Sequence, residues 1–222
     1  NRPPVVHDPD LIILSARDRS GKPIATLVNW ANHPETLASR NTLITADYPH
    51  YFSSRLEEKL PGVAILINGA VGGMQSPLGA RVTDSATGQP APDASFRKAE
   101  LIGNAVADLA SNAVSQSKTV RVRTVEFREK IVPVPVANLN FHLMAKLDLN
   151  RGRKRPNADG SLNAPVGLVR LSDGRRVRLE IALIPGEMYP ELSVGGVERY
   201  PGADYPDAPV EPVVAVPLDL GV

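Results

Sequence analysis

Two short apolar runs constrain the fold more than any other feature of this sequence. Residues 24–30 and 63–68 are apolar at nearly every position, without the alternation of a half-exposed strand. This pattern is typical of strands that are covered on both faces, so we expect buried strands here, with residues 24–30 central in a sheet. Another apolar run, residues 11–16, is separated from the first by a polar segment with Gly and Pro, which predicts a β-hairpin.

Helical spacing appears twice between and after these runs. Apolar residues recur every four positions from Tyr48 to Leu60, and Pro61-Gly62 then ends the pattern, which predicts an amphipathic helix that begins just after Asp47 and ends at Leu60. A second helix is predicted over residues 96–114, with the core positions Phe96, Ala99, Ile102, Val106, Leu109 and Ala113. Residues 79–95 lack periodicity and indicate a long surface loop.

The C-terminal half has the pattern of β-structure. We predict strands over residues 119–127, 131–136, 166–171 and 177–184, with a tight turn at 172–175 between the last two. Prolines at 201, 206, 209, 212 and 217 predict an extended tail or linker over residues 201–222. The expected fold class is therefore α/β: a mixed sheet with buried central strands flanked by helices, and a β-rich C-terminal half, within one section spanning residues 1–200.

Composition excludes several classes of function. Lys and Arg number 25 against 24 Asp and Glu, so the net charge of +1 gives no global field, and we expect no nucleic-acid partner. The basic residues at 151–155 and 175–178 are expected to form a solvated face. The absence of Cys excludes thiolate chemistry and leaves His, Asp, Glu or Tyr to hold any metal. No apolar run approaches the roughly 18 residues of a membrane span.

Two side chains follow predicted strands, where open α/β sheets place their functional sites. His33 lies just beyond residues 24–30, and Glu187 lies on the turn that Pro185-Gly186 makes after residues 177–184. Imidazole and carboxylate groups can hold a metal or act as general bases. Each also has a structural interpretation: a histidine that packs at a strand end, and an exposed turn glutamate.

Two further candidates lie near the other predicted elements. Ser76 follows a glycine-rich turn, residues 69–73, which can either bring backbone amides close to a ligand or simply make a tight connection. The Ser76 segment is neither a P-loop nor a Gly-x-Ser-x-Gly elbow. Asp47 precedes a predicted helix, where it can act as an N-cap or orient a neighbouring histidine. For His7, His50 and His142 the structural interpretation dominates.

The order of these segments resembles the catalytic domain of the neutral/alkaline non-lysosomal ceramidases. The resemblance covers most of the chain and rests on four segments and on the opening Asn1-Arg2-Pro3-Pro4. In chain order the four are Asn29-Trp30-Ala31-Asn32-His33-Pro34, residues 41–47 ending in Asp47, residues 68–77 ending in Gln75-Ser76-Pro77, and Ile184-Pro185-Gly186-Glu187.

The resemblance implies a zinc-dependent hydrolase of the amide bond in an N-acylsphingosine, with one Zn²⁺ held by two His, a Glu and a Tyr. His33 and Glu187 match two of those ligands, Ser76 matches a serine beside the metal, and Asp47 would support the site. The other two ligands are expected upstream of Asn1 and downstream of Val222, so we expect an interior section of a longer enzyme.

The same resemblance implies a lipid-like N-acyl substrate, peripheral membrane contact to reach it, and a secreted or periplasmic location. Two alternatives remain open: a non-catalytic α/β module that binds a ligand or partner, and a metal-free serine esterase that uses Ser76.

Overall fold

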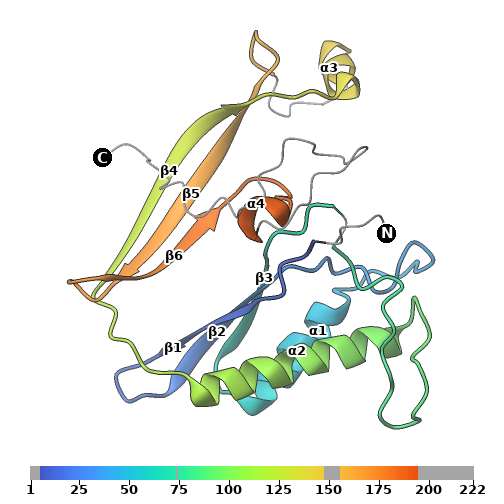
Figure 1. The fold of residues 1–222 in the computed structure, drawn as a ribbon, viewed down its shortest axis with the longest axis vertical. Coiled ribbons are helices and arrows are strands. Elements are labelled where there is room, and N and C mark those ends of the chain that lie inside the picture. Colours follow the sequence, from blue (N-terminus) through green and yellow to red (C-terminus); the bar gives the residue numbers. More distant parts are fainter. Residues whose placement is uncertain (1–5, 74, 148–155, 195–222) are drawn as a thin grey trace. The chain divides into compact units, whose positions relative to one another are not determined.

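The structure of the protein is a computed structural model that describes residues 6–73, 75–147 and 156–194 (Figure 1). The described residues form two compact units. One holds the residues up to Lys118 together with those from Glu187 onward, and the other holds the residues between Thr119 and Gly186. Helices and mixed or antiparallel sheets make up the fold, which confirms the α/β class. The predicted boundary at residue 200 and the proline-rich tail lie outside the described residues.

The first unit contains a mixed sheet in the order β1-β2-β3 (Figure 1). Strand β1 (Leu11–Arg17) pairs antiparallel with β2 (Pro23–Trp30), and β2 pairs parallel with β3 (Val63–Asn68). The predicted hairpin and the central position of residues 24–30 are therefore confirmed. The prediction that residues 63–68 are buried on both faces was wrong: they form an edge strand of the described sheet, and Val63 and Ile65 are 59% and 40% exposed.

Helices α1 (Tyr48–Lys59) and α2 (Phe96–Gln116) lie together on one face of this sheet (Figure 1). Both helices were predicted. The core between them and the sheet is built from fully buried side chains, among them Val28, Tyr48, Phe52, Leu56, Ala107 and Ala110. The helices approach closely at Gly103, where a Cβ atom would lie 2.5 Å from the carbonyl oxygen of Tyr48.

The buried face of α2 differs from the predicted one. Phe96 and Leu109 are 42% and 60% exposed, and Ala113 is exposed too. The buried stripe runs instead through Gly103, Ala107 and Ala110, as well as the predicted Ala99, Ile102 and Val106. These small residues let α1 approach α2 closely on that side. The larger Leu109 therefore lies outside the buried face.

The second unit is an antiparallel sheet in the order β4-β5-β6. Its strands are β4 (Thr124–Val134), β5 (Leu162–Ser172) and β6 (Val177–Leu183), and the predicted β5–β6 hairpin is confirmed. The prediction of two separate strands over 119–127 and 131–136 was wrong, because Arg128, Glu129 and Lys130 continue the pairing of β4 with β5. Charged residues are tolerated there because most of β4 is exposed to solvent.

Two short helices complete the described chain. Helix α3 (Leu139–Lys146) follows β4 and was not predicted, and α4 (Glu191–Val194) belongs to the first unit. Within the described residues, no helix combines the length and the apolar character needed to cross a membrane.

Candidate functional site

The two parallel strands of the first unit bring two loops to the same edge of the sheet. The carboxyl ends of β2 and β3 lie side by side, and the amide of Gly69 donates to the carbonyl of Trp30 at 3.0 Å. His33 follows β2, and the glycine-rich turn of residues 69–73 follows β3. Crevices at such carboxyl ends are where open α/β sheets bind ligands.

The ring of His33 is fixed by the main chain of the loop after β3. Its backbone amide and its ring Nδ1 lie 2.8 Å and 2.7 Å from the carbonyl oxygen of Gln75. A carbonyl can only accept, so Nδ1 carries a proton and donates it, and Nε2 is left as the free coordinating or basic atom. Sequence patterns do not single out Gln75, because a main-chain carbonyl makes this contact whatever side chain the residue carries.

Glu187 lies at that free nitrogen. Its Oε1 is 3.3 Å from Nε2 of His33, and the two side chains are 64% and 21% exposed respectively. The two strongest metal candidates of the sequence are therefore brought together from opposite ends of the described chain. Their meeting point is partly open to solvent, as a ligand-binding position requires.

The surroundings of His33 favour its charged form. Partial burial by itself lowers the pKa of the imidazole, but the hydrogen bond to the Gln75 carbonyl and the carboxylate of Glu187 outweigh that effect. The pKa of His33 therefore lies above its ordinary value. In the metal-free protein the pair is an ion pair when the imidazole is protonated.

The glycine turn positions the segment that carries Glu187. The amide of Gly72 donates to the carbonyl of Met188 at 2.8 Å. A Cβ atom at Gly72 would lie 2.8 Å from the main chain of Met188 and 2.9 Å from the carbonyl oxygen of Glu187, so only glycine permits this approach. The amide of Gly72 is therefore used in a main-chain hydrogen bond within the protein, which agrees with the structural interpretation of the turn as a tight connection.

Ser76 lies next to Gln75 but makes no hydrogen bond to His33 or Glu187, all three being described residues. Its hydroxyl oxygen accepts from the amide of Leu78 at 3.1 Å. A serine nucleophile needs a base within hydrogen-bond reach, and neither residue of the pair provides one here.

Asp47 connects the loop after His33 to helix α1. One carboxylate oxygen accepts from the amide of Tyr48 at 2.6 Å, and the other accepts from the amide of Leu37 at 3.0 Å. Asp47 is 4% exposed and has φ 57° and ψ −147°, a conformation that is costly for any residue except glycine. Neither carboxylate oxygen binds His33; each accepts from a main-chain amide, one in the loop and one at the start of α1.

His33 and Glu187 are residue types that bind zinc, but two ligands are fewer than a protein zinc site normally has. Imidazole nitrogen and carboxylate oxygen are the zinc ligands expected where Cys is absent. Two ligands of one tetrahedral zinc lie about 3.3–3.5 Å apart, which the observed 3.3 Å matches. Among the described residues, however, no group of three or more His, Asp or Glu could hold a metal ion.

The remaining histidines lie away from this pair. His7 and His50 are exposed, and His50 packs against the ring of Tyr51. His142 lies on α3 in the second unit, with Nε2 at 2.6 Å from the carbonyl oxygen of Val136. Of the basic cluster, residues 151–155 lie outside the described part of the chain, and Arg178 pairs with Asp173.

Sequence comparisons find no relatives. No protein-family model matches the chain, and no curated protein sequence matches it. Solved structures do match. The neutral ceramidase from Pseudomonas aeruginosa is similar with a TM-score of 0.50 and 14% identity, over 74% of this chain and 33% of that one. A ceramidase complexed with C2 gives a TM-score of 0.51 and 13% identity, over 77% of this chain and 36% of that one.

These likenesses show a shared fold. The chain spans about a third of the length of the two ceramidases. The shared fold agrees with the family that the ordered motifs resemble.

Proposed function

We propose that this chain is a section of a zinc-dependent hydrolase that cleaves the amide bond of a lipid-like N-acyl substrate. The observation that carries the proposal is the His33–Glu187 pair, with Nε2 and Oε1 3.3 Å apart and Nδ1 already committed to the Gln75 carbonyl. A metal-bound histidine usually donates the proton of its other ring nitrogen to a carbonyl or carboxylate oxygen. The ceramidase fold supports the reaction class.

In this proposal His33 and Glu187 are two of the metal ligands, and any further His, Asp or Glu ligand must come from outside the described residues. Zinc bound there supplies a Lewis acid for the amide carbonyl and lowers the pKa of a water molecule to about 7. The Gln75 carbonyl keeps the imidazole in the tautomer whose Nε2 faces the site. Ser76, adjacent to Gln75, would position the substrate or stabilise negative charge on the carbonyl oxygen. Asp47 would support the loop that carries His33.

The proposed substrate also implies its setting. An N-acyl lipid resides in or at a membrane, so the protein would make peripheral membrane contact, and a secreted or periplasmic location belongs to the same proposal.

Zinc binding by the purified protein tests the proposal directly. We expect wild-type protein to bind Zn²⁺ in equilibrium dialysis, and Glu187→Gln and His33→Ala each to abolish binding. His50→Ala is the matched control, because His50 is exposed on α1 and belongs to no pair of this kind. Zinc binding that survives in both variants would refute the assignment.

A non-catalytic α/β module is the second candidate. The lack of a third His, Asp or Glu ligand among the described residues favours it, since two ligands hold zinc weakly. Protein that binds no zinc, and that hydrolyses no N-acyl substrate when zinc is added, would establish this alternative. A metal-free serine esterase would instead retain its activity in EDTA and lose it in Ser76→Ala.

A further inference from the structure

Lys98 is a buried cation in an unfavourable place. Its side chain is 0% exposed, and it lies in the first turn of α2, three residues after the N-cap Ser95. Positive charge at a helix N-terminus opposes the helix dipole, and a buried ammonium is costly unless it is paired and hydrogen-bonded. Local helix stability therefore does not explain a lysine here, and the explanation must lie in what the ammonium binds.

The ammonium binds the main chain next to Ser76. Nζ donates to the carbonyl oxygen of Pro77 at 2.8 Å and forms an ion pair with Asp93. Pro77 is buried, and its carbonyl also accepts from the amide of Ala80 at 3.1 Å. Two donors therefore fix this carbonyl, and one of them carries the charge that makes a hydrogen bond strong.

The same short segment holds His33. The carbonyl of Gln75, two residues before Pro77, accepts from both the amide and the ring Nδ1 of His33. Residues 75–77 are thus tied at one end to the imidazole and at the other end to α2. Only Ser76 lies between the two residues whose carbonyls are held in this way.

We propose that Lys98 is a positioning residue for the candidate site, which holds residues 75–77 in the conformation that orients the imidazole of His33. The importance of this role rests on the proposed function of His33. The contact itself can be tested in zinc-free protein without substrate.

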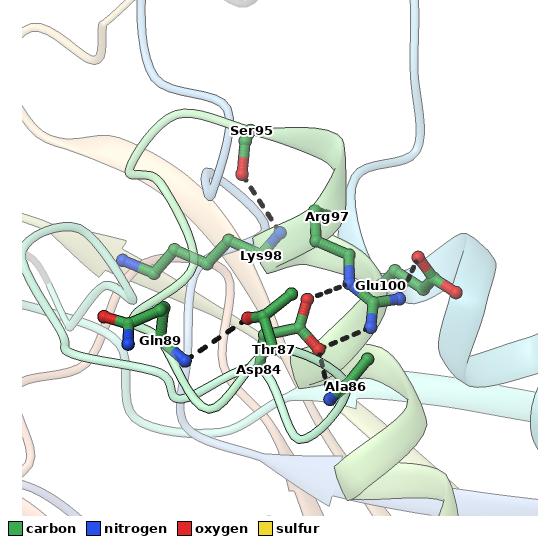
Figure 2. A network of polar contacts seen from close by, with 8 residues as sticks. All are labelled: Asp84, Ala86, Thr87, Gln89, Ser95, Arg97, Lys98 and Glu100. Carbon is green, nitrogen blue, oxygen red and sulfur yellow. Dashed lines mark hydrogen bonds and ion pairs between the residues drawn. The ribbon is translucent and has the colours of Figure 1, made fainter.

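Arg97 provides a matched control on the same helical turn. It pairs with Asp84 at 2.7 Å and with Glu100 at 2.9 Å, and Figure 2 shows its side chain running away from that of Lys98. Arg97 therefore anchors the loop before α2 as Lys98 does, but it does not contact residues 75–77. Arg97→Met removes an anchor of the loop only, whereas Lys98→Met removes both an anchor of the loop and the hydrogen bond to the Pro77 carbonyl. Comparing the two variants therefore isolates the effect of the contact with Pro77.

The experiment compares Lys98→Met with Arg97→Met by NMR in zinc-free protein. For Lys98→Met we expect exchange of the His33 backbone amide to accelerate roughly 5- to 10-fold beyond any change in α2, as for loss of one hydrogen bond. At a pH above the pKa of His33, where the ring is neutral, its ring ¹⁵N shifts should move away from those of the Nδ1–H tautomer. Arg97→Met should leave both readouts unchanged. Unchanged His33 readouts in folded Lys98→Met would overturn the proposal.

A measurement on wild-type protein covers the case in which Lys98→Met does not fold. The ammonium ¹⁵N signal of Lys98 should be protected from exchange with water and show scalar coupling to the carbonyl carbon of Pro77. An ammonium that exchanges freely would overturn the proposal. Failure of the proposed zinc function can be distinguished from failure of the Lys98 proposal. If only the zinc function is wrong, wild-type protein binds no zinc, but the His33 signals still change in Lys98→Met.

Discussion

The carbonyl oxygen of Gln75 lies 2.8 Å from the amide nitrogen of His33 and 2.7 Å from its ring Nδ1. One acceptor therefore sets both the path of the loop after β2 and the tautomer of its histidine. The consequence is that Nε2 faces Glu187 in every protonation state of the ring. What varies with pH is the charge of the imidazole and not the identity of the atom that faces the site.

The ion pair predicts a pH-dependent stability in zinc-free protein. The pKa of His33 is raised above 6.5, so the fold favours the protonated ring. Its contribution to the free energy of unfolding is complete below pH 6.5 and is lost as the pH rises through the folded-state pKa. We therefore expect Glu187→Gln to be less stable than wild type below pH 6.5, with the difference shrinking at higher pH.

Urea denaturation in EDTA at a series of pH values measures this difference. The effect is small because Glu187 is largely exposed. Glu58→Gln is the control, since Glu58 is exposed on α1 and should show no such profile. A destabilisation by Glu187→Gln that grows with pH would contradict the prediction.

Gly72→Ala is expected to displace the segment that carries Glu187. The added methyl group would lie 2.8 Å from main-chain atoms of Met188 and Tyr189, which cannot yield as a flexible side chain can. We expect a loss of about 1–3 kcal/mol in the free energy of unfolding and loss of zinc binding. Gly186→Ala is the matched control, because a Cβ atom there meets nothing within 4 Å. Equal behaviour of the two variants in denaturation and dialysis would refute this.

Periodicity was enough to predict most of the first unit, since the hairpin and both helices are encoded locally. It wrongly placed Leu109 on the buried face of α2. The position at which α1 crosses α2, next to Gly103, decides which face is buried, and this position depends on tertiary packing. It divided β4 in two because Arg128, Glu129 and Lys130 are charged, although an exposed strand accepts them.

Only the part of the candidate site that depends on side-chain identity could be predicted from the sequence. His33 and Glu187 follow predicted strands and match motif positions, so their side chains stood out in the sequence. Gln75 acts through its carbonyl, which carries no residue-specific signal. Lys98 lies on a predicted helix, where a lysine normally indicates a solvated face, and only its burial shows otherwise.

The loop before α2 is expected to loosen in acid. Arg97 and the amide of Ala86 hold the pKa of Asp84 at about 2, below its ordinary 3.8. Asp84 therefore contributes stability above pH 3.8, and that contribution is lost as the pH falls towards 2. Thermal unfolding between pH 5 and 2 should show wild type approaching Asp84→Asn in stability. A constant difference over this range would contradict the prediction.

Asp47 combines a capping role with backbone strain, and substitutions separate the two. Asp47→Ala removes the cap of α1 and leaves the buried amide of Leu37 without its acceptor, which together cost about 2–4 kcal/mol. Asp47→Gly loses the same hydrogen bonds but relieves the strain of φ 57° and ψ −147°. We therefore expect the glycine variant to be the more stable of the two.

The N-cap of α2 is the reference for that comparison, because Ser95 has an ordinary extended conformation with φ −122°. Glycine is also the better N-cap than alanine at an unstrained position, so the difference between Ser95→Gly and Ser95→Ala measures that preference alone. In urea denaturation the Gly-minus-Ala difference at Asp47 should exceed the one at Ser95 by about 1–3 kcal/mol. Equal differences at the two caps would mean that the backbone of Asp47 stores no strain, and that its carboxylate alone determines the entry of the chain into α1.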